Sequence, residues 1–71
     1  MKINDSYYVI INKENNYYNQ EEEWWYKDIR DATRYENYDQ ASGMSEYLNM
    51  YTMRDIAATL KRVRRKGMII N

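Results

Sequence analysis

Tyrosine must supply much of the core of this 71-residue chain, which holds nine Tyr and two Trp but no Phe. Ile, Val and Leu together number only eleven. A tyrosine ring can bury a large apolar area, but its hydroxyl needs a hydrogen-bond partner once buried. A chain this short also buries only about 60% of the surface that it exposes when unfolded. The sequence therefore predicts a single small domain over residues 1–71, with an amphipathic core.

The missing residue types argue against catalysis. The chain has no His and no Cys, and only two Gly. It therefore lacks the commonest general base, the thiol nucleophile and the usual soft metal ligands. It also has no Gly-rich phosphate loop. We expect no enzymatic activity, no cofactor and no metal site.

The compartment is predicted from segments that the sequence lacks. No apolar stretch approaches the ~18 residues of a membrane span. The N-terminal sequence MKINDSYYVIIN has no adequate apolar region or small-residue cleavage site of a signal peptide. Without cysteine there is no disulfide framework of the kind common in small secreted domains. We expect a cytoplasmic protein with no membrane partner.

The N-terminal third is predicted to form a β-hairpin over residues 6–26. Residues 6–12 (SYYVIIN) are rich in β-formers, and the Asn residues in 13–16 tolerate the positive φ of a tight turn. Residues 17–26 (YYNQEEEWWY) are interpreted as the second strand. The acidic run 21–23 is poor strand material and is expected to be a bulge or a solvent-facing edge.

A helix is expected after a connecting segment. Residues 27–36 favour a loop or a short helical turn, with Ile29 and Tyr35 as core contacts. Asn37 is a suitable N-cap. The apolar residues that follow recur at the spacing of an amphipathic helix; they are Tyr38, Ala41, Met44, Leu48 and Tyr51.

The C-terminal segment has two interpretations. Local signals favour a helix over 53–66, with a capping residue at Thr52 and Gly67 just past its end. A strand over 57–65 would instead complete a three-stranded sheet, which is stable where a lone hairpin is marginal. We favour the strand, which gives an α+β fold of order ββαβ; the second helix is the alternative.

The order YYVIIN…YY…WWY…DIRDATRYENYDQA…LKRV resembles small early or accessory proteins of phages of low-GC Gram-positive bacteria. The resemblance implies a phage-type accessory protein, a group that includes inhibitors of host defence such as anti-CRISPR proteins. No functional residue carries over from it. The residues that carry the resemblance are Tyr8, Val9, Ile10, Tyr18, Trp25, Asp31, Ala32, Tyr35, Ala41 and Val63.

Charge is divided along the chain. Residues 1–53 hold ten acidic and five basic side chains, whereas residues 54–71 hold one acidic and six basic. Acidic side chains on one face could imitate a phosphate array, and Trp24 or Trp25 should be exposed because neighbours on a strand face opposite ways. A solvated face is the alternative. The predicted acidic and aromatic face comprises Glu21, Glu22, Glu23, Trp24, Tyr26, Asp28 and Asp31.

A basic run is the strongest local charge feature. It comprises Lys61, Arg62, Arg64, Arg65 and Lys66. On a strand, Arg62, Arg64 and Lys66 would share one face and could follow a phosphate backbone or meet an acidic partner. The alternative is a solvated edge, and the isoelectric point of about 6.2 is lower than that of typical nucleic-acid modules.

Together these features predict a non-enzymatic protein-interaction module. The favoured hypothesis is a phage-type inhibitor that binds a host protein, such as a defence or nucleic-acid-handling enzyme, and occludes its surface. A small nucleic-acid-binding protein that uses the basic run is the alternative. A third hypothesis is a homodimer in which the acidic part of one copy meets the basic tail of another.

Overall fold

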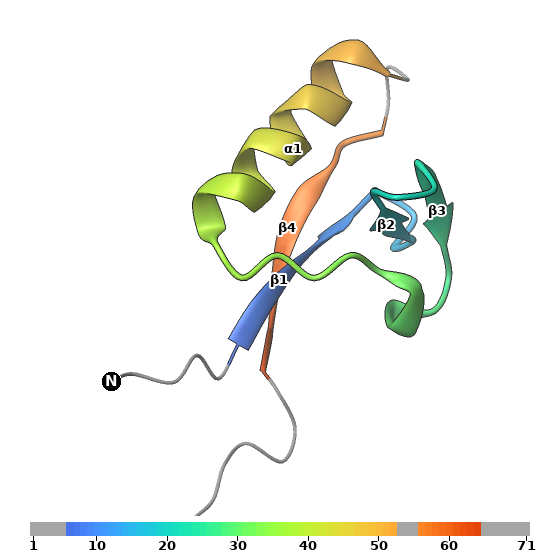
Figure 1. The fold of residues 1–71 in the computed structure, drawn as a ribbon. Coiled ribbons are helices and arrows are strands. Elements are labelled where there is room, and N and C mark those ends of the chain that lie inside the picture. Colours follow the sequence, from blue (N-terminus) through green and yellow to red (C-terminus); the bar gives the residue numbers. More distant parts are fainter. Residues whose placement is uncertain (1–5, 53–55, 65–71) are drawn as a thin grey trace, which may run out of the picture.

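The strand β1 (Ser6–Ile11) organises the sheet, because it is paired along both of its edges. The computed structural model describes residues 6–52 and 56–64. Within them an antiparallel four-stranded sheet of order β3-β2-β1-β4 is covered by one helix (Figure 1). The predicted α+β class and the ββαβ order are confirmed, with one strand more than expected. The other elements are β2 (Tyr17–Asn19), β3 (Trp24–Tyr26), the 3-10 helix η1 (Ile29–Asp31), α1 (Tyr38–Tyr51) and β4 (Thr59–Arg64).

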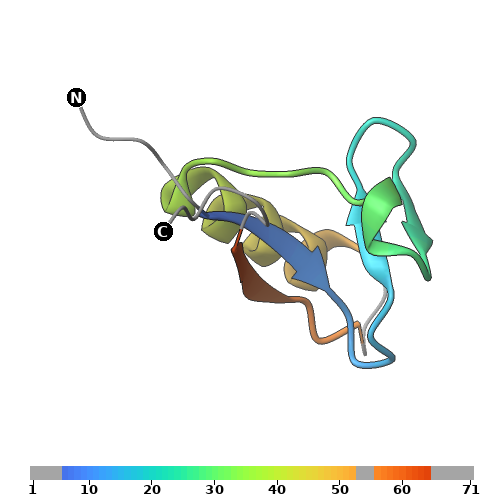
Figure 2. The ribbon, with the colours of Figure 1, turned by 90° about the horizontal axis from the view of Figure 1, so that it is seen from below.

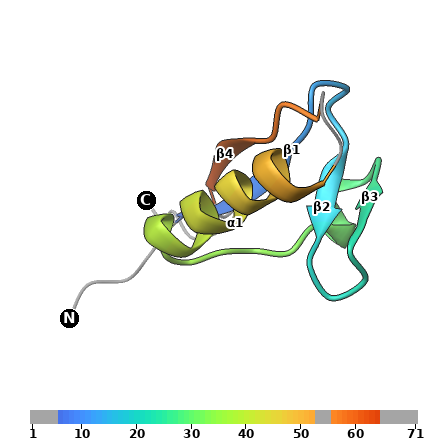
Figure 3. The same ribbon diagram turned by 90° about the horizontal axis from the view of Figure 1, so that it is seen from above.

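One edge of β1 carries a long ladder and the other is shared by two segments. All six residues of β1 pair with β4, from Ser6 opposite Arg64 to Ile11 opposite Thr59. On the other edge, β2 meets β1 only at the Ile11–Tyr17 pair. The rest of that edge is used by the segment before α1, which forms an isolated antiparallel bridge to Tyr8. Because β2 and β1 share so short a stretch of pairing, the β2–β3 hairpin lies at a steep angle to β1 and β4, at the end of their ladder (Figures 2 and 3).

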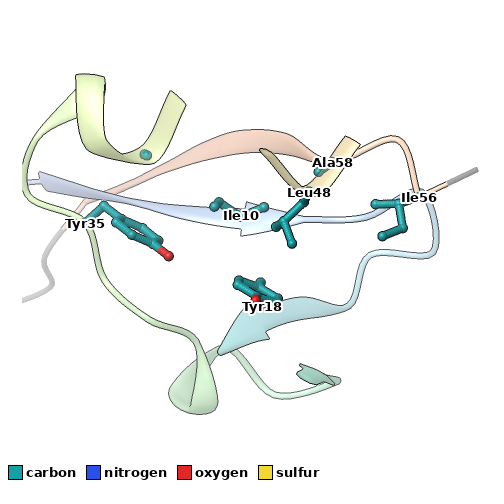
Figure 4. Packing of buried hydrophobic residues seen from close by; sticks show 7 residues of the cluster. Ile10, Tyr18, Tyr35, Leu48, Ile56 and Ala58 are labelled. Carbon is teal, nitrogen blue, oxygen red and sulfur yellow. The ribbon is translucent and has the colours of Figure 1, made fainter. Parts of the chain in front are cut away.

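The core lies between α1, the ladder and the hairpin, and two tyrosines contribute to it. Tyr18 and Tyr35 are 5% and 6% exposed, beside the fully buried Ile10 and the almost fully buried Leu48 (Figure 4). The Tyr35 hydroxyl donates to Gln20 Oε1 at 2.6 Å. The predicted tyrosine core is thus present, and the Tyr35 hydroxyl reaches its partner in the turn between β2 and β3. The cluster comprises Ile10, Tyr18, Tyr35, Ala41, Leu48, Ile56 and Ala58.

The C-terminal ambiguity is settled in favour of the strand. Residues 59–64 form β4, so the helix predicted over 53–66 is wrong for this stretch. The local capping signals are outweighed by the backbone hydrogen bonds of a six-pair ladder and by the burial of Leu60 opposite Ile10. Residues 53–55 and Arg65 onward lie outside the described residues.

The second predicted strand is in fact two strands. The chain turns between Asn19 and Trp24, which pair with one another, so residues 20–23 form the loop of the β2–β3 hairpin. Asn19 Oδ1 accepts from the Glu22 amide at 2.9 Å, and Glu23 takes a left-handed φ of 54°. The acidic run is therefore a turn, rather than a bulge or an edge, because carboxylates have low strand propensity while the Asn19 side chain supports a local turn.

The helix begins where predicted and buries the middle of the predicted stripe, but not its two ends. Asn37 caps α1 by accepting from the Asp39 amide at 2.7 Å. Ala41 and Leu48 are buried as expected and Met44 packs against the core, but Tyr38 and Tyr51 are 56% and 68% exposed. The buried polar residue of the helix is Ser45.

Two polar side chains of α1 form hydrogen bonds with the backbone of the residue before β4. Ser45 Oγ and Asn49 Nδ2 both donate to the Ala58 carbonyl at 3.1 Å, and the Ala58 amide donates to Asn49 Oδ1 at 2.7 Å. These bonds satisfy buried backbone groups where the chain enters the sheet.

The connecting segment holds the short helical turn that was predicted. Asp28 caps η1, and Tyr35 reaches the core as expected. Ile29 is half-buried and lies outside the core cluster, so its predicted core contact is wrong. A 3-10 helix of three residues offers no long face with which to bury it.

Raising the pH through the range from 10 to 12 should weaken the fold. Burial raises the pKa of Tyr35 to about 12, whereas an unfolded tyrosine titrates near 10. The unfolded chain therefore loses this proton first, so the free energy of unfolding falls as the pH rises. One pKa unit is worth about 1.4 kcal/mol. Because ionisation is half complete in the unfolded chain at pH 10 and in the folded chain at pH 12, we expect a fall of about 2 kcal/mol between these pH values in urea denaturation.

The variant Tyr35→Phe tests whether Tyr35 causes this loss of stability at alkaline pH. It should cost about 1 kcal/mol at neutral pH, because the hydrogen bond to Gln20 is lost, and it should reduce the alkaline fall. Tyr51→Phe is the matched control, since that ring is exposed, and it should leave the fall unchanged. An undiminished alkaline fall in Tyr35→Phe would contradict the prediction.

Candidate partner-binding surface

The acidic turn is presented by the β2–β3 hairpin, away from the middle of the β1–β4 ladder (Figures 2 and 3). Glu21, Glu22 and Glu23 are all exposed. Neither Glu21 nor Glu23 is paired with a cation within 6–52 and 56–64. The turn therefore carries uncompensated negative charge into solvent.

The two tryptophans divide between core and solvent, as the strand alternation predicts. Trp25 is partly buried, and its ring centroid lies 5.0 Å from that of Tyr18. Trp24 is 64% exposed beside the acidic turn. The expectation of one exposed tryptophan is confirmed, and the exposed one is Trp24.

Tyr26 supports the acidic turn. Its hydroxyl donates to Glu22 Oε1, and this hydrogen bond is the main reason why the pKa of Tyr26 is raised. The bond links the end of β3 to the middle of the turn that precedes it. Tyr26 thus serves the predicted surface by fixing the position of Glu22.

The remaining predicted acidic residues belong to a second area. Asp28 forms an ion pair with Arg30 at 2.7 Å, and the hydrogen bonds from the Arg30 side chain and amide lower the pKa of Asp28 to about 2. Its charge is therefore partly neutralised. Asp31 lines an open hollow of about 600 Å³ with Glu21 and Arg30, and its carbonyl accepts from Asn19. The predicted face thus has two areas, joined through the turn.

A groove of about 460 Å³ separates the hairpin from α1. Glu23 and Trp24 line it on the hairpin side, and Met44 and Tyr47 line it on the helix side. Tyr47 is 52% exposed. Its place was missed because it lies outside the apolar stripe of the helix; the one signal for it was its spacing of four residues from Tyr51, whose ring centroid lies 5.3 Å away.

The groove is electrostatically negative. Burial raises the pKa of Tyr18, and the charge of Glu23 raises it further, with a smaller effect from Tyr47. Glu23 itself lines the groove, so its carboxylate places a negative charge there. No basic side chain lines the groove within the described part of the chain.

The basic residues of β4 lie on both faces of the sheet. Arg62 and Arg64 share one face, as predicted for a strand, and line a hollow of about 260 Å³ with Ser6. Arg62 Nε donates to Ser6 Oγ at 3.2 Å. Lys61 points to the other face, where its Nζ lies 6.0 Å from the Tyr17 ring centroid. Arg65 and Lys66 lie outside the described residues.

Comparison with known proteins gave no match to a family model, a curated protein or a solved structure. Over residues 6–52 and 56–64, no group of three or more His, Cys, Asp or Glu side chains is placed to hold a metal ion. No helix in these ranges is both long enough and apolar enough to span a bilayer.

Glu23→Gly should stabilise the fold. A left-handed φ costs a residue with a Cβ about 1–2 kcal/mol, and glycine removes this cost. Glycine also loses more backbone entropy on folding, which destabilises the fold by about 0.5–1 kcal/mol. We expect a net gain of about 0.5–1 kcal/mol in urea denaturation. Ala57→Gly is the matched control, because Ala57 has a similar φ of 51° and is exposed. A loss in Glu23→Gly beside a gain in Ala57→Gly would contradict the prediction and give the Glu23 side chain a structural role.

Proposed function

We propose that this protein is a non-enzymatic protein-interaction module that binds a basic protein surface through its β2–β3 hairpin. One observation carries the proposal: the carboxylates of Glu21 and Glu23, unpaired within the described residues, lie in the turn that leads directly into the exposed Trp24 at the start of β3. Tryptophan is a favoured anchor at protein interfaces. The adjoining carboxylates would steer a basic partner and fix its orientation.

The proposed mechanism is occlusion without chemistry. Carboxylates that project from a narrow turn can occupy positions that phosphates of a nucleic acid would take in a basic groove. The resemblance to phage accessory proteins supports a host target, and a defence or nucleic-acid-handling enzyme has the basic surface that this charge requires. In that setting the module acts in the host cytoplasm as an inhibitor.

The double variant Glu21→Lys and Glu23→Lys should abolish capture of the partner. The experiment is a tagged pull-down from a lysate of a low-GC Gram-positive host, treated with nuclease and read by mass spectrometry. We expect wild-type protein to retain one basic protein near stoichiometry. Affinity for that protein should fall at least about tenfold in the variant, or about 1.4 kcal/mol, because attraction becomes repulsion.

The matched control is Glu14→Lys with Glu46→Lys, which changes the net charge equally at two exposed positions. It should retain the partner, and circular dichroism should show both variants folded. A folded Glu21/Glu23 variant that binds as well as wild type would rule out the proposed surface.

A second candidate function is nucleic-acid binding, favoured by the hollow that Arg62, Arg64 and Ser6 line on the helix-bearing face. Two guanidinium groups and a hydroxyl are groups that commonly contact phosphate. Lys61 lies on the other face of the sheet, so fewer cations of β4 can contact the same nucleic-acid strand.

Arg62→Ala with Arg64→Ala tests this candidate by fluorescence anisotropy with single-stranded and duplex DNA. If the hollow binds phosphate, affinity should fall and the slope of log K against log salt should flatten by about 1.4 to 1.8. Lys13→Ala with Lys27→Ala removes the same charge elsewhere and should have little effect. Full affinity in the Arg62/Arg64 variant would exclude this function.

A further inference from the structure

We propose that the groove between α1 and the β2–β3 hairpin receives an arginine side chain of the protein partner, between Trp24 and Tyr47 and paired with Glu23. The inference rests on the proposed function and deepens it, because it names the group that the basic partner inserts. Since Tyr47 and α1 lay outside the predicted surface, it also adds a second wall to that surface.

The shape of the groove suits a long side chain. Its volume of about 460 Å³ is within the range of ligand-binding clefts. Two aromatic residues on different elements line it, Trp24 from β3 and Tyr47 from α1, and both are more than half exposed. Leu48 and Ile56 of the core also line it, so the methylene stem of a bound side chain would contact apolar atoms.

The charge of the groove selects a cation. Among the groove-lining residues that the structure describes, Glu23 is the charged one. Its negative charge helps to raise the pKa of Tyr18, which also lines the groove. A cation is attracted both by a carboxylate and by the faces of Trp and Tyr rings. Arginine fits better than lysine, because its planar guanidinium stacks on aromatic rings and makes bidentate bonds to a carboxylate.

The test uses the full chain, labelled with ¹⁵N, and two blocked tripeptides. One is acetyl-Ala-Arg-Ala-amide and the other carries citrulline, which has nearly the same shape without the charge. We expect the arginine peptide to cause saturable shifts at the Trp24 indole N–H and at the Tyr47 and Glu23 amides. The citrulline peptide should bind at least about fivefold more weakly.

Substitutions separate the groove from general charge attraction. Glu23→Gln should lower affinity for the arginine peptide by the same factor and abolish the preference over citrulline. Trp24→Ala should remove saturable binding. Glu46→Gln is the matched control, because Glu46 is exposed next to Tyr47 but does not line the groove, and it should bind as wild type does.

Three outcomes with a peptide present would overturn the inference. They are equal binding of the two peptides, undiminished binding by Glu23→Gln, and shifts centred on the second acidic area around Asp31. Shifts of Trp24 that depend on protein concentration, without peptide, would instead assign the groove to a second copy of the chain and would also overturn it.

Failure of this inference is distinguishable from failure of the proposed function. If the pull-down yields a partner that depends on Glu21 and Glu23 while the arginine peptide leaves Trp24 unaffected, the surface stands and the groove is wrong. If the peptide binds in the groove while no basic protein is retained, the groove stands and the proposed function is wrong.

Discussion

Tyr35 joins the two parts of this fold. Its backbone exchanges two hydrogen bonds with Tyr8 on β1, at 2.8 and 2.9 Å, while its buried ring sends a hydroxyl to Gln20 in the hairpin turn. The hairpin has only one residue pair with β1, so these contacts largely determine where it stands. The neighbouring Thr33 adds two bonds, from its amide to the Tyr18 carbonyl and from the Gln20 amide to its hydroxyl. The position of the acidic turn thus depends on a segment without regular secondary structure.

A core built on tyrosine has a consequence for the surface. A buried tyrosine must place its hydroxyl where a partner or water can reach it, so the ring lies at the edge of the core. Tyr18 illustrates this, because its ring packs in the core cluster while the residue also lines the groove that Glu23 and Tyr47 border. The groove and the hydrophobic core therefore share Tyr18, Leu48 and Ile56, so a change in core packing would alter the groove.

Local patterns predicted this chain best where one interaction dominated. The Asn37 cap, the buried Ala41 and Leu48 and the division of the two tryptophans followed from short-range rules. β4 could be predicted only from the need of a hairpin for a third strand, since its own residues favour a helix. The turn at residues 20–23 was missed because it depends on a hydrogen bond from the Glu22 amide to the Asn19 side chain, and strand propensities do not include such bonds. The helix contacts of Ser45 and Asn49 with Ala58 could not be predicted, because they depend on where β4 begins.

The candidate site illustrates the same limit. The acidic residues and Trp24 are adjacent in sequence, so charge and aromatic content alone pointed to them. Tyr47 is more than twenty residues away and joins them only because Tyr35 and Thr33 hold the hairpin opposite the exposed side of α1. A surface formed between two elements that share few backbone bonds needs such side-chain links to keep its shape. The aromatic and acidic walls of the groove are therefore preorganised by residues that would not themselves touch a partner, which lowers the entropy cost of binding.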